Sequence, residues 1–512
     1  RVERLMRVRE KYAAAAAQPL RNQLECAPGP QVLALSEQLG RAARQRQPST
    51  SRVEAVEASV AVLPFLNLGS GAEDEYFADG VTEDVIAQLS KIRALKVISR
   101  SSVMPFKQRQ SSIRDVGRAL GVATVLDGSI RRSGDRVRIV AKLVDARTDR
   151  HLWVETYDRQ LTDIFSIQTY VALSIAAALK AELTRDERAR VQTEPTTDLR
   201  AYQFFLRGRQ LLTEYTAGSM ASAIESFEQA IARDPDFVFA HALLATACIE
   251  SVEHGTILPA LAYGRAAKAV STALRLDPGL GAAHCAMAQL EMMRDFDWAG
   301  AERDFKRALE LSPSYSDAYD LYGRLCAALE RYDEALALLQ RARKLDPLAH
   351  RNDISSTLLR AGRYDEALRV AKDASEMDAS HARTLATLGW AYFLSGQQGA
   401  GVAELEHAVA VSPGSTLWLS QLGQAYALSG REAYARALLL ELEARGKQSY
   451  VSPYHLAYVY TGLGEADRAI DLLEDAVAER SGPTYGIKSS FLFRSLHSNP
   501  RFAALMKQLN MS

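Results

Sequence analysis

The sequence predicts an α/β domain, with the element order βαβαβββα on a mixed sheet, followed by an all-α solenoid of helical pairs. Two observations predict this fold class. Short apolar runs bounded by turn residues occupy the first third of the chain and suit strands. From residue 201 onward one outline recurs about every 34 residues, which indicates stacked helical pairs that cannot bury their apolar faces alone.

The α/β domain is expected over residues 59–190. Residues 59–68 form a continuous apolar run, which suits a strand buried on both faces. Further strands are expected over residues 95–99, 123–132, 136–145 and 151–157. Helices are expected over residues 75–92, 112–120 and 163–182, and Gly121 ends the second of them. Helices packed on a mixed sheet bury the apolar faces of both layers.

The solenoid is expected over residues 198–512, with about eight helical pairs and a capping segment after residue 485. Helix-ending prolines recur along it at Pro235, Pro278, Pro313, Pro347 and Pro413. Small residues recur at Ala301, Ala335, Ala367, Gly401, Ala435 and Ala469. Paired helices cross closely only where side chains are small, so these positions mark the crossing point of each pair.

This spacing closely resembles the tetratricopeptide repeat, with Gly323, Gly389 and Gly423 at its glycine position. The resemblance implies a curved array whose first helices line a concave groove. Six side chains are candidates for that groove: Arg324, Trp390, Phe393, Gln424, Tyr454 and Tyr458. Residues at one repeat position would form a ladder along the groove, and such a ladder suits a protein or peptide partner. Packing between helices is the alternative interpretation.

Several phrases of the α/β region resemble the TolB-like amino-terminal domain of bacterial regulators. They begin at Val62 (VLPF), Tyr76 (YFADGVTED), Val97 (VISRSS), Tyr157 (YDR) and Asp163 (DIFSIQ). The resemblance implies a non-enzymatic domain placed between a DNA-binding or signalling head and a tetratricopeptide array.

Residues 1–43 resemble the last helices of the bacterial transcriptional activator domain, with Pro28 and Pro30 between two helical stretches and Cys26 where glycine is usual. Residues 44–58 are expected to be a linker. The resemblance implies a DNA-binding head upstream and hence the regulatory part of a transcriptional regulator. The alternative is the regulatory part of an adenylate cyclase or a Ser/Thr protein kinase.

Composition excludes several classes of protein. The net charge is zero, so no global field attracts nucleic acid, and DNA contact is expected only through an upstream domain. The four cysteines are too few for a disulfide scaffold. None of them forms a CxxC pair, which argues against a zinc knuckle. The most apolar window, residues 170–179, is short of the about 20 residues that a bilayer needs. We therefore expect a cytoplasmic protein with no membrane span, and a homo-oligomer is left open.

No stretch predicts catalysis, a cofactor or a metal. Asp74 stands where a dinucleotide-binding loop has its third glycine, and acidic residues would repel a phosphate there. Asp79, Glu83 and Asp84 could approach a metal by helical spacing, but a polar helix face is the preferred interpretation. We therefore expect a non-enzymatic binding protein.

Overall fold

The computed structural model describes residues 58–69, 72–108, 111–212, 217–253, 257–377 and 381–511. The chain divides into two compact units, Arg1–Val56 and Glu57–Ser512, and all of the described residues belong to the second. The helices expected over residues 1–43 and the linker up to residue 57 lie outside the described residues.

The second unit begins with a mixed sheet, as predicted. Its strands run in the order β3-β1-β4-β5-β6. Their bounds are β1 Ser59–Val62, β3 Lys96–Val97, β4 Thr124–Ser133, β5 Arg136–Asp145 and β6 His151–Gln160. Strand β1 lies parallel to β3 and β4, whereas β4, β5 and β6 are antiparallel. Strand β6 therefore forms one edge of the sheet.

The apolar run over residues 59–68 was expected to be one strand, but it forms two. Strand β1 ends before Pro64, and the short strand β2 (Leu66–Asn67) pairs separately with β4. Proline has no amide to donate to a ladder. The Phe65 amide donates instead to the Thr82 hydroxyl at 2.9 Å, which ties the break to the following helix.

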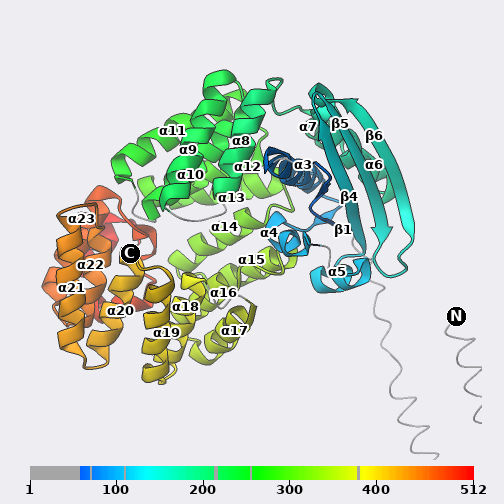
Figure 1. Ribbon diagram of the computed structural model, residues 1–512. Coiled ribbons are helices and arrows are strands. Elements are labelled where there is room, and N and C mark those ends of the chain that lie inside the picture. The colour runs from blue at the N-terminus through cyan, green and yellow to red at the C-terminus, as the bar shows by residue number, and fades with distance from the viewer. Residues whose placement is uncertain are drawn as a thin grey trace, which may run out of the picture. The chain divides into compact units, whose positions relative to one another are not determined.

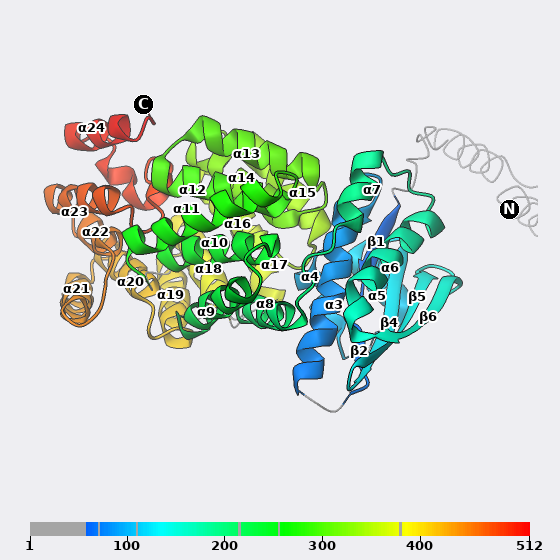
Figure 2. The same cartoon turned by 90° about the horizontal axis from the view of Figure 1, so that it is seen from above.

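Five helices belong to the α/β domain: α3 Ala72–Ser90, α4 Arg100–Val103, α5 Ile113–Leu120, α6 Ile164–Ala178 and α7 Arg185–Gln192. Helix α5 begins where the Ser112 hydroxyl accepts from the Asp115 amide, and it ends at Gly121 with a left-handed φ of 62°. Both views place α3 between the sheet and the solenoid (Figures 1 and 2).

One segment, Leu161–Ala178, is long and apolar enough to cross a membrane by length and composition. Half of that window is buried inside the protein, where α6 packs on the sheet. A buried core helix passes the same test, so this segment is weak evidence for a membrane span.

The described part of the solenoid contains eight helical pairs, the number expected. The first four are α8 Leu199–Leu212 with α9 Ala217–Arg233, α10 Val238–Glu253 with α11 Pro259–Leu276, α12 Gly281–Leu290 with α13 Trp298–Leu311, and α14 Ser316–Ala328 with α15 Tyr332–Leu345. The last four are α16 Arg351–Arg360 with α17 Tyr364–Met377, α18 Ala382–Leu394 with α19 Gln398–Val411, α20 Thr416–Leu428 with α21 Glu432–Gly446, and α22 Pro453–Gly462 with α23 Ala466–Glu479.

Small residues do mark the close crossings. A Cβ atom added to Gly401 of α19 would lie 2.6 Å from the carbonyl oxygen of Gly389 on α18. The alanines at the equivalent positions of the neighbouring pairs, Ala367 and Ala435, are fully buried. Backbones can approach this closely only where no larger side chain separates them.

Residues 481–511 follow the last pair and are called the tail below. The tail contains two short 3₁₀ helices, Thr484–Gly486 and Phe491–Leu496, and ends with helix α24, Pro500–Gln508.

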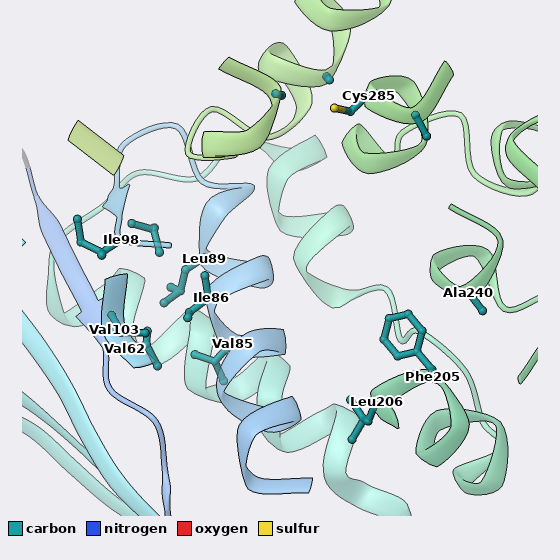
Figure 3. Packing of buried hydrophobic residues seen from close by; sticks show 14 of the residues in the cluster. Val62, Val85, Ile86, Leu89, Ile98, Val103, Phe205, Leu206, Ala240 and Cys285 are labelled. Atoms are coloured by element: carbon teal, nitrogen blue, oxygen red, sulfur yellow. The ribbon is translucent and has the colours of Figure 1, made fainter. Parts of the chain in front are cut away.

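Two large apolar cores hold the unit together. The first joins the α/β domain to the early repeats, so that Val62 and Leu89 belong to the same cluster as Phe205 of α8 (Figure 3). The second joins the later repeats to the tail, and includes Trp390 and Phe493. The α/β domain and the first half of the solenoid therefore share one core.

Candidate functional site

The six residues of the predicted ladder do lie on first helices of the array. Arg324 is on α14, Trp390 and Phe393 are on α18, Gln424 is on α20, and Tyr454 and Tyr458 are on α22. Five of them are almost completely buried: Trp390, Phe393, Gln424, Tyr454 and Tyr458. Arg324 keeps 23% of its side-chain area exposed.

The tail contacts four of the five buried residues, Trp390, Gln424, Tyr454 and Tyr458, whereas Phe393 packs edge-on against Trp390. The Phe491 ring lies edge-on to Trp390, with centroids 5.8 Å apart, and Phe493 stacks on Tyr458 at 5.0 Å. The Gln424 amide donates to the carbonyl oxygen of Leu492 at 2.6 Å. We expected these side chains to form an open ladder, but an aromatic segment of the same chain packs on them. Binding of a partner there stays a prediction.

The tail also reaches back to earlier repeats. The Trp298 indole of α13 donates to the carbonyl oxygen of Leu509 at 2.8 Å, and Lys488 pairs with Glu330 at 3.2 Å. Between these two contacts, Arg501 of α24 pairs with Asp471 and Glu474 of α23. The tail is thus the expected cap on the last pair and, in addition, a strap across the inner side of the array.

Arg324 belongs to a different arrangement, a group of charges around buried carboxylates that we call the His350 cluster: Asp320, Arg324, His350, Asp353 and Arg383. The Arg324 Nε atom lies 2.9 Å from Asp320 and 3.2 Å from Asp353, which also pairs with Arg383. His350 Nδ1 lies 3.2 Å from Asp320. Burial disfavours the charged imidazole, but the hydrogen bond and charge of Asp320 outweigh burial and raise the pKa of His350 to about 9.

The ligand atoms of Asp320, His350 and Asp353 all lie within 4.8 Å of one another, a spacing that could suit a metal ion. The same carboxylates already face the guanidinium groups of Arg324 and Arg383. A divalent cation would therefore sit beside two fixed positive charges, which Coulomb repulsion disfavours. The donor set suits a closed ion-pair network better than a metal site.

The His350 cluster adjoins a polar contact between the α/β domain and the solenoid. The Ser101 and Ser102 hydroxyls, at the start of α4, both donate to the Asp346 carboxylate at the end of α15. The Ser99 amide donates to the carbonyl oxygen of Leu345 at 2.9 Å, and the Ser314 hydroxyl donates to that of Leu95 at 3.0 Å. These hydrogen bonds fix the end of β3 and α4 against α14 and α15.

A second polar contact joins α3 to α8. Arg209 of α8 is 8% exposed and reaches Asp84 at 2.6 Å and Glu83 at 2.8 Å. Tyr202 and Gln168 also donate to Asp84. Burial raises the pKa of Asp84, and the Arg209 charge opposes that rise. We call the two polar contacts together the interdomain seam.

The α3 and α8 backbones come close at Gly80. A Cβ atom there would lie 2.4 Å from the Leu206 side chain. Any larger residue would force α3 and α8 apart or displace Leu206.

The interpretation of Glu83 and Asp84 as an ordinary polar helix face was wrong, because both carboxylates pair with Arg209 across the interdomain seam. Asp79 differs from them, since it pairs within the α/β domain with Lys107 at 2.8 Å. The missed signal lay in the quoted phrases: those at Tyr76, Val97 and Asp163 contain most of the α/β-domain residues of the seam.

Comparison with known families identifies the parts of the chain. Residues 56–172 match the second domain of HilA/YgeH-like transcriptional regulators. Residues 292–351 and 352–415 match tetratricopeptide repeat models. The α/β domain is thus regulator-like, the solenoid is tetratricopeptide-like with repeat matches over residues 292–415, and neither kind of domain is catalytic.

A curated protein of Rhizobium meliloti (strain 1021), "Putative adenylate cyclase 3", is 43% identical over 187 residues. The match covers 36% of this chain and 32% of that protein, so the chain spans about a third of the length of this relative.

Solved structures with tetratricopeptide folds are also similar to parts of the chain. YrrB, described as having an unusual peptide-binding site, is 23% identical with a TM-score of 0.27 and covers 38% of this chain and 97% of its own. PilW, a type IV pilus biogenesis factor, is 19% identical with a TM-score of 0.34, covering 41% and 94%. The Cut9–Hcn1 complex is 14% identical with a TM-score of 0.41, covering 66% and 63%.

Proposed function

We propose that this chain is the non-enzymatic regulatory and protein-interaction part of a bacterial transcriptional regulator. A DNA-binding head would precede it, and the α/β domain, TolB-like in its phrases, would pass a change of state to the repeats. The proposal places the protein in the cytoplasm. The observation that carries it is the interdomain seam, because a buried polar contact couples the position of α3 and α4 to that of α8, α14 and α15.

The match to a HilA/YgeH-like regulator domain favours this proposal. The alternative, the regulatory part of an adenylate cyclase, draws its support from the relative in Rhizobium meliloti. Determining the gene sequence upstream of the Arg1 codon separates the two. A winged-helix domain there supports the first proposal, and a cyclase core refutes it in favour of the second.

We propose further that the groove under the tail is where a partner segment binds, with the tail as its competitor within the same chain. The tail then defines the chemistry of the partner: two aromatic residues spaced as in Phe491 and Phe493, and a backbone carbonyl for the Gln424 amide. Recognition of a peptide segment by side-chain pockets along a groove is a recurring mode of protein binding.

A peptide-binding experiment tests the groove. Reversing the charge of Lys488 and Arg494 removes the contacts of the tail with Glu330 and Tyr364, and leaves the groove residues intact. A labelled peptide of residues 484–511 is expected to bind this variant more tightly than the unaltered chain. The same peptide with Phe491 and Phe493 replaced by serine is the control and should not bind. Equal binding by both peptides, or by neither, contradicts the proposal.

A further inference from the structure

Strand β6 is a long sheet edge with apolar residues on both of its sides. Among the described strands it pairs only with β5. Leu152 and Val154 are 41% and 51% exposed on one side. On the other side lies Tyr170 of α6, 52% exposed, whose ring contacts Tyr157 of β6 at 5.8 Å. Charged residues protect many natural edge strands, and β6 carries Glu155, Asp158 and Arg159, but the exposed apolar side chains of Leu152, Val154 and Tyr170 that flank them have no cover among the described residues.

The backbone groups along this edge can be assigned. The Leu161 amide donates to the carbonyl oxygen of Asp135 at 2.7 Å, which makes these two residues a hydrogen-bonded pair. In an antiparallel ladder such pairs alternate with pairs that make no bonds to each other. The residues whose amides and carbonyls point to the free edge are therefore Val154, Thr156, Asp158 and Gln160.

We propose that this edge is a homodimer interface, in which β6 pairs antiparallel with β6 of a second copy. Two-fold symmetry requires one residue of β6 to lie opposite itself. With Tyr157 at that point, Glu155 of each copy faces Arg159 of the other, and no like charges lie directly opposite each other. The outward-pointing residues also face one another, so that about eight backbone hydrogen bonds can form.

The charges favour this register over the register that has Glu155 opposite itself. With Glu155 opposite itself, two carboxylates would meet at the axis, which destabilises a cross-strand pair. The exposed face of α6 runs beside β6, so that the two Tyr170 side chains approach each other in the dimer. A second copy thus covers both the backbone edge and the apolar residues that flank it.

Charge exchange at two positions tests the proposal in the full chain by sedimentation velocity. The unaltered chain is expected to dimerise at micromolar concentrations. Glu155→Arg alone and Arg159→Glu alone each place like charges opposite and should raise the dissociation constant at least about tenfold. The double variant Glu155→Arg/Arg159→Glu restores opposite charges and should restore the dimer. Arg131→Glu, on β4 and away from the edge, is the control and should change nothing.

Thr156→Pro tests the edge independently of charge. The Thr156 amide points away from β5, so proline removes no bond of the existing ladder but blocks the new one. The variant is expected to be monomeric with an unchanged circular dichroism spectrum. A monomeric unaltered chain overturns the proposal, as does a dimer that survives Thr156→Pro or the single charge reversals.

Discussion

The solenoid is held from two sides, and the two contacts differ in chemistry. On one side the interdomain seam joins the α/β domain to α8, α14 and α15 through hydroxyl groups, carboxylates and Arg209. On the other side the tail fills the inner face of the later repeats with aromatic rings. Each contact is continuous with one of the two large apolar cores.

Because of this difference, the two contacts lose stability in different ways when a residue is replaced. An aromatic contact loses stability in proportion to the cavity that a truncation leaves. A buried ion pair loses stability when one charge is left without its partner, and it can also respond to pH. The interdomain seam is thus the contact suited to transmit a change of state, and the tail is suited to fix a shape. Four variants, in decreasing order of their predicted effect on stability, test that division.

Phe493→Ala should weaken the tail contact most. The side chain is fully buried against Tyr454 and Tyr458, so its loss should lower the free energy of unfolding of the later repeats by about 4 kcal/mol. Urea denaturation followed by circular dichroism measures the change. Phe491→Ala is the matched control, since its half-buried ring should matter less. Equal effects would show that the tail does not pack as described.

Arg209→Met should destabilise the interdomain seam by about 3 kcal/mol, because it leaves the largely buried Asp84 carboxylate without its cation. The more exposed Glu83 keeps its pair with Arg100 at 3.0 Å. The exposed neighbour Arg207 provides the control, and Arg207→Met should change the urea midpoint little. A seam variant as stable as the control would mean that the ion pair is not buried.

His350→Asn should make the free energy of unfolding vary less with pH between 6.5 and about 9. The folded pKa of about 9 lies above the ordinary 6.5, so protonated His350 stabilises the fold fully below pH 6.5, and this contribution is lost as pH rises through 9. Asparagine tolerates the left-handed φ of 62° at this position. The unaltered chain should exceed the variant by about 2 to 3 kcal/mol at pH 6, with the difference vanishing above pH 9. A constant difference across that range would contradict the assignment.

Gly80→Ala should destabilise the contact between α3 and α8 by about 1 kcal/mol, since the new methyl group would overlap Leu206. Gly264 is a helical glycine with open space around its Cβ position, so Gly264→Ala should stabilise the chain by about 0.5 kcal/mol instead. Opposite signs in thermal unfolding support the close approach. Stabilisation by both substitutions would contradict it.

Much of the fold could be predicted from the sequence, because its determinants are local. The left-handed turn at Gly121 and the close crossing at Gly401 follow from the residue types themselves. The break of the first apolar run at Pro64 was missed, although the missing amide of proline predicts it.

The partners of the ladder residues could not be predicted, because they depend on contacts between distant segments. Trp390 and Phe491 are about a hundred residues apart in the chain and about 6 Å apart in space. The same holds for Arg209 and Asp84. The sequence of one helix predicts only that its charged residues face solvent, because the distant element that carries the opposite charge is not known from that sequence.

We conclude that the α/β domain and the first half of the solenoid behave as one cooperative unit joined by the interdomain seam. Hydrogen exchange of the unaltered chain and of Arg209→Met tests it most directly. We predict that protection falls together in α3, β4 and α8–α13, and stays unchanged in α18–α23. Loss of protection confined to the α/β domain would contradict the claim.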